Sequence, residues 1–172
     1  MVPPLTDILS VGKKKITLTK GQLDLGGIGK GYAIDALAEY LQTTHQFSYF
    51  LINGGGDIYA TSDNGRSVTV TLVHPTDQTQ GIGVAELHNQ GFAASSPYVR
   101  SWRDRKTGKA YNHLHSDSPV ASYVLAPTAS SADIWATTSA VEPDVVTPAD
   151  VQLLLIKEDK VLRTAEQFDI FT

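Results

Sequence analysis

Four segments of this sequence carry residue types whose spacing suits chemistry, and the first of them is rich in glycine. Residues 24–35 read DLGGIGKGYAID. Glycines let the backbone approach a ligand closely, and amide groups at the start of a helix form a site for anions. Lys30 would add a positive charge for a phosphate. The segment is neither a Walker A loop nor a dinucleotide-binding fingerprint, so phosphate binding and a plain tight turn before a helix both stay open.

The second segment, residues 53–57, reads NGGGD and follows an apolar run. Three consecutive glycines indicate a backbone pressed against a ligand or against another strand. A β-bulge or a turn accounts for the same residues. The segment therefore predicts a glycine-rich corner at a strand end and leaves a ligand contact open.

The third segment places a carboxylate and a hydroxyl on one face of an expected helix. Asp133 and Thr137 are four residues apart, which brings their side chains to the same face. Both can reach one hard cation, and Mg²⁺ prefers oxygen ligands completed by water and substrate phosphates. The alternative is structural, with Asp133 suiting the helix dipole and Thr137 bonding back to a carbonyl.

The fourth segment holds two histidines, His113 and His115, which would point the same way on a strand. No cysteine and no third histidine lies near them. One histidine acting as a general base is therefore favoured over zinc binding, because the pKa of histidine lies near operating pH.

The composition is that of one soluble globular domain. The chain has 172 residues, of which 41% are hydrophobic and 19% charged, and its net charge is −4. This balance argues against a general nucleic-acid binder, so we expect no nucleic-acid partner. The absence of cysteine excludes disulfides, thiolate metal sites and a cysteine nucleophile. Since no apolar run is long enough to cross a membrane and the first residues lack a basic and an apolar region, we expect no membrane span and no signal peptide in these residues.

The hydrophobic patterning predicts an α+β fold, with mixed or antiparallel sheets and few helices. A continuous apolar run predicts a buried strand over 47–52, and a polar, aromatic stretch over 95–111 is expected to be a loop or an insertion. A β-hairpin is expected over 151–164. Further short strands are expected over residues 16–19, 68–73, 83–87, 91–94 and 122–126.

Two helices are expected. The first spans residues 32–43, and its apolar residues recur at helical spacing on one face; they are Ala33, Leu37, Tyr40 and Leu41. The second spans residues 129–140, with Thr128 or Ser130 as its N-cap.

Taken in order, these segments resemble the FAD:protein FMN transferase family, also called the ApbE family. The resemblance rests on DLGGIGKGYAID at 24–35, on NGGGDI at 53–58 and on ADIWAT at 132–137. It runs from about Ile16 to the hairpin and covers only the C-terminal portion of the family's proteins. It implies that residues 1–172 form a single truncated, T-fold-like domain that lacks the family's N-terminal portion.

The resemblance also implies an activity. Family members use Mg²⁺ and FAD, attach the FMN phosphate to a threonine or serine hydroxyl of a target flavoprotein, and release AMP. A FAD pyrophosphatase and a non-catalytic or partly degenerate flavin-binding module stay open as alternatives. Family members are commonly exported and membrane-anchored, while the localisation of this chain stays open. A truncated domain would expose apolar surface that a homodimer would cover.

Residue roles follow from the resemblance alone. It assigns Asp133 and Thr137 to the metal, with a backbone carbonyl near Gly27 as a third ligand. His113 would take the proton from the acceptor hydroxyl. The FAD contacts fall on residues of the glycine-rich segments and on one serine, namely Gly26, Gly27, Lys30, Gly31, Asp35, Gly55, Gly56, Asp57 and Ser95.

Overall fold

The computed structural model describes residues 4–63, 65–98, 101–112, 114, 120–157 and 160–171. Its centre is a six-stranded sheet in which every neighbouring pair is antiparallel. In spatial order the strands of this large sheet are β12 (Lys160–Arg163), β11 (Gln152–Lys157), β10 (Ala121–Ala126), β7 (Gln90–Ser95), β4 (Ile58–Thr61) and β3 (Phe50–Asn53).

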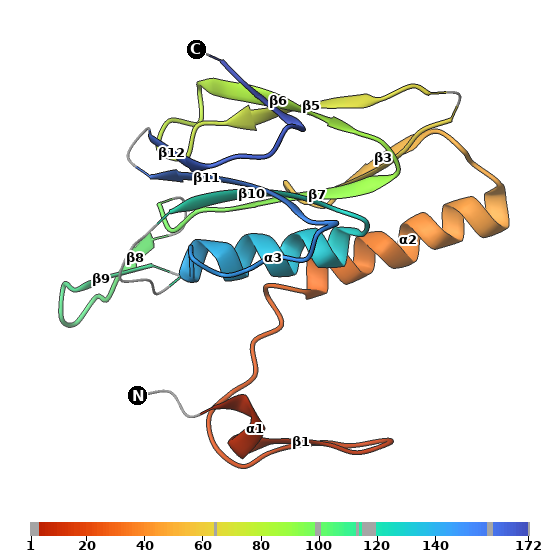
Figure 1. Ribbon diagram of the computed structural model, residues 1–172. Helices are drawn as coiled ribbons and strands as arrows, with labels where there is room; N and C mark the ends of the chain where they lie inside the picture. The colour runs from red at the N-terminus through yellow and green to blue at the C-terminus, as the bar shows by residue number, and fades with distance from the viewer. Residues whose placement is uncertain are drawn as a thin grey trace.

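Two further layers enclose the large sheet (Figure 1). A smaller antiparallel sheet covers one face and contains β13 (Phe168–Ile170), β6 (Gly81–Leu87) and β5 (Val68–Val73). Helices α2 (Gly29–His45) and α3 (Ala129–Val141) lie on the other face. The α+β class with antiparallel sheets and few helices is therefore confirmed.

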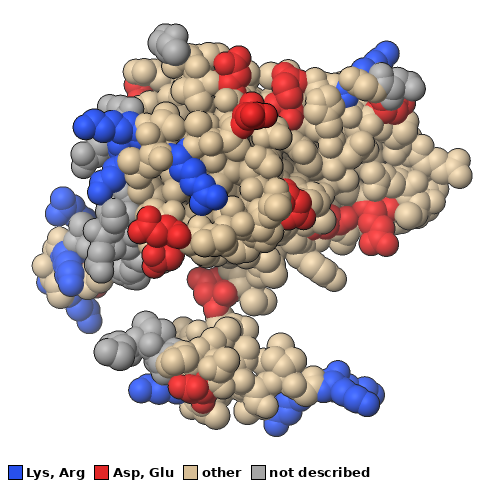
Figure 2. Space-filling model, viewed as in Figure 1, with Lys and Arg blue, Asp and Glu red and all other residues tan. Residues whose placement is uncertain are grey.

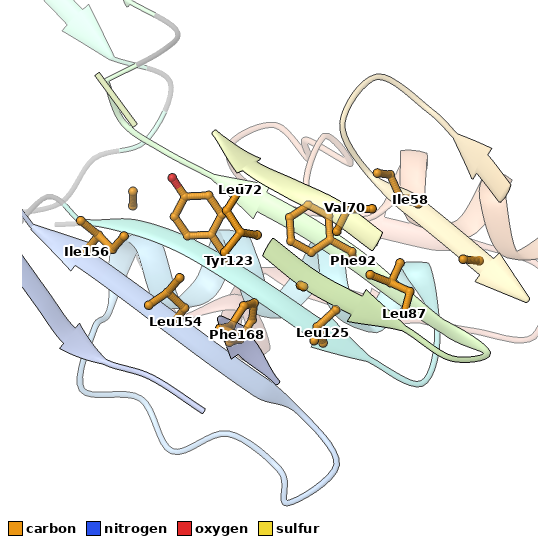
Figure 3. Packing of buried hydrophobic residues seen from close by; sticks show 13 residues of the cluster. Ile58, Val70, Leu72, Leu87, Phe92, Tyr123, Leu125, Leu154, Ile156 and Phe168 are labelled. Carbon is orange, nitrogen blue, oxygen red and sulfur yellow. The ribbon is translucent and has the colours of Figure 1, made fainter. Parts of the chain in front are cut away.

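The large sheet separates two apolar cores, because successive side chains of a strand point to opposite faces. On β10, Tyr123 and Leu125 face the smaller sheet, whereas Val124 faces α3. Figure 3 shows the first of these cores, which also takes side chains from β5, β6 and β7. The Tyr123 hydroxyl donates to the Val73 carbonyl at 2.6 Å, and burial raises the pKa of this phenol.

Glycines allow α3 to approach its neighbours closely. A Cβ atom at Gly31 would lie 2.6 Å from the Ala129 carbonyl oxygen, and one at Gly91 would collide with the backbone of Thr128. The N-terminus of α3 therefore rests on α2 and β7 without a side chain between the backbones. Of the two predicted N-cap candidates, Thr128 is the N-cap of α3 and Ser130 lies inside the helix; the Thr128 hydroxyl accepts a hydrogen bond from the Ser131 amide at 3.1 Å.

The helix expected over 32–43 is present as α2, but the prediction of its apolar face needs correction. Leu37 is 44% exposed and Tyr40 is 52% exposed. The buried face instead carries Gly31, Ile34 and Ala38. Gly31 occupies that face because the backbone of α3 lies directly against it, and Ile34 packs against Gly54 in the turn after β3.

The strand expected to be buried over 47–52 is also corrected. Strand β3 begins at Phe50 and lies at the edge of the large sheet, and Phe47 and Leu51 are exposed. An edge strand has a neighbour on one side only, so an apolar run does not ensure burial there.

The stretch expected to be a loop over 95–111 contains a two-stranded hairpin of β8 (Ser101–Arg103) and β9 (Ala110–Asn112). The rings of Trp102 and Tyr111 stack across this pair with centroids 6.2 Å apart.

The hairpin expected over 151–164 corresponds to β11 and β12, which pair antiparallel. Strand β13 follows it and returns to the smaller sheet, an element that the sequence did not indicate.

The first residues form an arm of α1 (Leu5–Ile8), β1 (Leu9–Val11) and β2 (Ile16–Leu18), which stands apart from the layered body in Figure 1. Strand β2 matches the strand expected over 16–19. Lysines gather at the far end of the arm (Figure 2), where residues 13–15 connect β1 to β2. No helix in the described part of the chain is both long and apolar enough to span a membrane.

The close packing of α2 on α3 leads to a prediction about two glycines in one helical turn. Gly31→Ala should lower the free energy of unfolding by about 1–3 kcal/mol, because the new methyl group would overlap the backbone of α3. Gly29→Ala is the matched control, since a Cβ at Gly29 meets nothing within 4 Å. It should raise stability by about 0.5–1 kcal/mol through helix propensity alone. Urea unfolding of both variants tests this, and equal effects would contradict the packing argument.

Candidate metal and phosphate site

An ion cluster forms where the N-terminus of α2 meets α3. The Lys30 ammonium forms an ion pair and a hydrogen bond with Oδ2 of Asp57, and it lies 3.5 Å from Oδ1 of Asp133. Asp57 is 4% exposed and Asp133 is 3% exposed. Two buried carboxylates from separate parts of the chain therefore share one lysine.

Asp133 and Thr137 lie on neighbouring turns of α3, with further polar groups around them. The other carboxylate oxygen of Asp133 accepts a hydrogen bond from the Gly31 amide at 3.3 Å. The hydroxyl of Thr137 lies 3.4 Å from the hydroxyl of Ser95 at the end of β7. The backbone of Gly27 packs against Thr137, since a Cβ there would lie 3.3 Å from the Thr137 hydroxyl oxygen. The structure thus brings the residues assigned to the metal together.

The donor set at this place suits Mg²⁺. It offers one carboxylate from Asp133, hydroxyls from Thr137 and Ser95, and the backbone of the Gly27 loop. The described residues contain no group of three or more histidine, cysteine, aspartate and glutamate side chains able to hold a metal. An oxygen-only set with few carboxylates fits a small hard cation that keeps water and phosphate oxygens in its shell.

The glycine loop before α2 uses several of its own amides. The Gly26 amide donates to Asp24 at 2.8 Å, the Gly29 amide donates to the Leu25 carbonyl at 2.8 Å, and the Gly31 amide donates to Asp133. These groups therefore have acceptors inside the chain. The Lys30 side chain is the cationic group of this loop and is 40% exposed; its contact with a phosphate stays a prediction.

Asp35 has a clear structural task. Its carboxylate accepts hydrogen bonds from the amides of Ala129 and Ser130 at 2.7 and 2.9 Å, and from the Ser130 hydroxyl at 2.5 Å. It thereby satisfies amides at the N-terminus of α3 that have no partner within the helix. A contact of Asp35 with FAD stays a prediction.

The second glycine segment forms the turn between β3 and β4. Gly55 and Gly56 have φ values of +84° and +107°, which favour glycine. Their amides donate to the Asn53 side-chain oxygen at 3.0 and 2.9 Å. The turn ends at Asp57 and so presents this carboxylate to Lys30. Contacts of Gly55 and Gly56 with a ligand stay predictions.

Sequence reasoning assigned Lys30 and Asp57 separately to a ligand and missed their ion pair. These residues are 27 positions apart, so no local spacing could reveal the contact. The predicted general base, His113, lies outside the described residues, and its role stays a prediction. Its predecessor Asn112 ends β9.

Residues 5–150 match the model of the ApbE family. Because this match covers most of the 172 residues, the chain belongs to the ApbE family. A relative from Haemophilus influenzae, named FAD:protein FMN transferase, is 29% identical over 167 residues. That alignment covers 92% of this chain but 46% of the relative, so the chain spans about half of that protein's length.

Solved structures show the same fold. The ApbE protein from Thermotoga maritima superposes with a TM-score of 0.75 at 19% identity, covering 93% of this chain and 57% of that one. The flavin transferase ApbE from Vibrio cholerae gives a TM-score of 0.65 at 20% identity, covering 94% and 57%. Both likenesses confirm the α+β architecture predicted from the sequence.

The cap that Asp35 forms on α3 leads to a second prediction. Asp35→Ala should lower the free energy of unfolding by about 1–2 kcal/mol, the usual effect of losing a helix-capping acceptor. Glu39→Ala, one turn further along α2 and exposed, should change stability by less than about 0.5 kcal/mol. Thermal unfolding followed by circular dichroism distinguishes the two, and a Glu39→Ala loss as large as that of Asp35→Ala would contradict the capping role.

Proposed function

We propose that this chain carries the metal- and phosphate-binding part of an FMN transferase. The activity would move FMN from FAD to a threonine or serine hydroxyl of a target flavoprotein and release AMP. The observation that carries this proposal is the lysine between two buried carboxylates, with the Thr137 hydroxyl one turn beyond Asp133. The similarity to proteins named FAD:protein FMN transferase and flavin transferase ApbE supports flavin transfer.

The transfer forms one bond and breaks one. The acceptor hydroxyl oxygen bonds to the phosphorus of the FMN half, and the bond from that phosphorus to the bridging pyrophosphate oxygen breaks. AMP leaves with the bridging oxygen. The hydroxyl proton passes to a base, for which His113 is our candidate. Water in place of the hydroxyl would give FMN and AMP, which is the pyrophosphatase reaction.

The residues of this chain serve mainly to position charge, which is most of what phosphoryl transfer requires. Asp133 and Thr137 would hold Mg²⁺, together with a backbone oxygen near Gly27. When bound, Mg²⁺ neutralises the charge on the pyrophosphate oxygens. The Lys30 ammonium lies 3.5 Å from Asp133. A pyrophosphate bound to a metal on Asp133 would therefore be within reach of Lys30.

The remaining contacts of the proposed complex concern the flavin and the partners. Gly26, Gly55, Gly56 and Ser95 are our candidates for further FAD contacts. The acceptor is a flavoprotein with an accessible threonine or serine. A homodimer is a further part of the proposal, since Leu37 and Tyr40 of α2 are exposed apolar side chains that a second copy would cover.

Removing the carboxylate of Asp133 tests the proposed function. Asp133→Asn keeps the side-chain volume but removes the only carboxylate assigned to the metal. Mg²⁺-dependent release of AMP from FAD should fall at least about a hundredfold, because a catalytic metal contributes several kcal/mol. Asp144→Asn, an exposed aspartate beyond α3, is the matched control and should leave the rate unchanged.

The assay titrates the chain with FAD, with and without Mg²⁺, and measures AMP in the same samples by chromatography. Mg²⁺-dependent binding with AMP release supports the proposal. FAD binding without AMP, even with an acceptor flavoprotein present, would favour a non-catalytic flavin-binding module. Unchanged turnover in Asp133→Asn would remove the metal assignment.

A further inference from the structure

Lys30 has two buried carboxylate partners at unequal distances. Its ammonium is hydrogen-bonded to Asp57, whereas its separation from Asp133 is 3.5 Å, beyond the usual length of a hydrogen bond. Interactions between charges are strong where little water is present. The position of the Lys30 ammonium between these two carboxylates therefore affects how tightly Asp133 binds any other cation.

One carboxylate oxygen of Asp133 lies near Lys30, and a metal ion would compete with the ammonium for it. Its Oδ2 accepts the Gly31 amide, and Oδ1 is the oxygen nearest to Lys30. A divalent cation on Asp133 would face the ammonium across that same carboxylate. The two positive charges repel, so Mg²⁺ binds more tightly the more firmly Lys30 is held elsewhere.

The turn that carries Asp57 is held in place by several hydrogen bonds, so Asp57 can fix the position of Lys30. It follows the turn that Asn53 closes by accepting the amides of Gly55 and Gly56. The Asp57 carbonyl accepts the Gly54 amide at 2.8 Å, and Gly54 lies directly against Ile34 of α2. A carboxylate on a turn tied down at several points changes position little, so it is an effective anchor for a long, flexible lysine.

We propose that Asp57 is a positioning residue that holds the Lys30 ammonium off Asp133 and thereby keeps Asp133 available to Mg²⁺. This inference rests on the proposed function, since it takes Asp133 as the metal ligand. Asp57 needs no contact with the metal or with FAD to act in this way. If Asp57 loses its charge, Lys30 moves to Asp133 and competes with the metal.

A double-mutant cycle on the full chain tests this without FAD. The readout is the affinity for Mn²⁺, a spectroscopic substitute for Mg²⁺, measured by electron paramagnetic resonance. Asp57→Asn should weaken Mn²⁺ binding about tenfold, and adding Lys30→Met should restore it. Lys30→Met should raise affinity at least about fivefold more in the Asp57→Asn background than in the wild type, the non-additivity typical of residues in contact.

Two controls separate positioning from a general effect of charge. Asp24→Asn removes a negative charge from the glycine loop before α2, and Asn keeps an oxygen for the Gly26 amide bond; it should weaken Mn²⁺ binding less than about threefold. Lys30→Arg should bind Mn²⁺ within about threefold of the wild type, because it retains the pair with Asp57. These controls decide the question even if Lys30→Met alone, which removes the shared cation from two buried carboxylates, does not fold.

The outcomes are distinct. Normal Mn²⁺ binding with additive effects, or an Asp24→Asn loss equal to that of Asp57→Asn, would overturn the inference and leave the proposed function standing. Failure of every protein, the wild type included, to bind Mn²⁺ would overturn both. Weakening by Asp57→Asn that is specific to that residue and reversed by Lys30→Met supports the positioning role.

Discussion

The direct backbone contact between α2 and α3 is the constraint on which the site depends. Gly31 has no side chain, so the first turn of α2 lies against Ala129 and Ser130. The Asp35 carboxylate, one turn later, accepts the amides of the same two residues. Together these contacts fix where α3 begins relative to α2. Asp133, four residues into α3, is thereby placed beside the Gly31 amide and the Lys30 ammonium.

The cost of burying charge explains why this arrangement is better suited to binding than to stability. Removing two carboxylates from water is unfavourable, and a buried ion pair often contributes little net stability compared with apolar residues of the same size. The formal charges of Asp57, Asp133 and Lys30 sum to −1. Such a site gains from a further cation. Under the proposed function, the hydroxyls of Thr137 and Ser95 beside it would be further oxygen ligands for that cation.

The sequence predicted the features that depend on local spacing. Asp133 and Thr137 share a helix face because of the period of the α-helix, and Thr128 is an N-cap because of its side chain. The buried face of α2 was mispredicted, since the close contact of Gly31 with α3 turns the face of Gly31, Ile34 and Ala38 inward. The exposure of β3 depends on its edge position in the sheet. The pairing of Lys30 with Asp57 depends on how a turn and a helix meet in space.

Strand β7 contributes both to the packing of α3 and to the candidate site. Gly91, near the start of this strand, leaves room for the backbone of Thr128, so α3 lies directly on the sheet. Ser95 at the end of the same strand consequently comes within 3.4 Å of Thr137. A ligand that bound across these elements, as we propose, would favour the packed arrangement, because the unfolded chain cannot assemble the same donors. The glycines that permit close packing therefore determine the positions of the Asp133, Thr137 and Ser95 oxygens, although Gly31 and Gly91 contribute no side chain of their own.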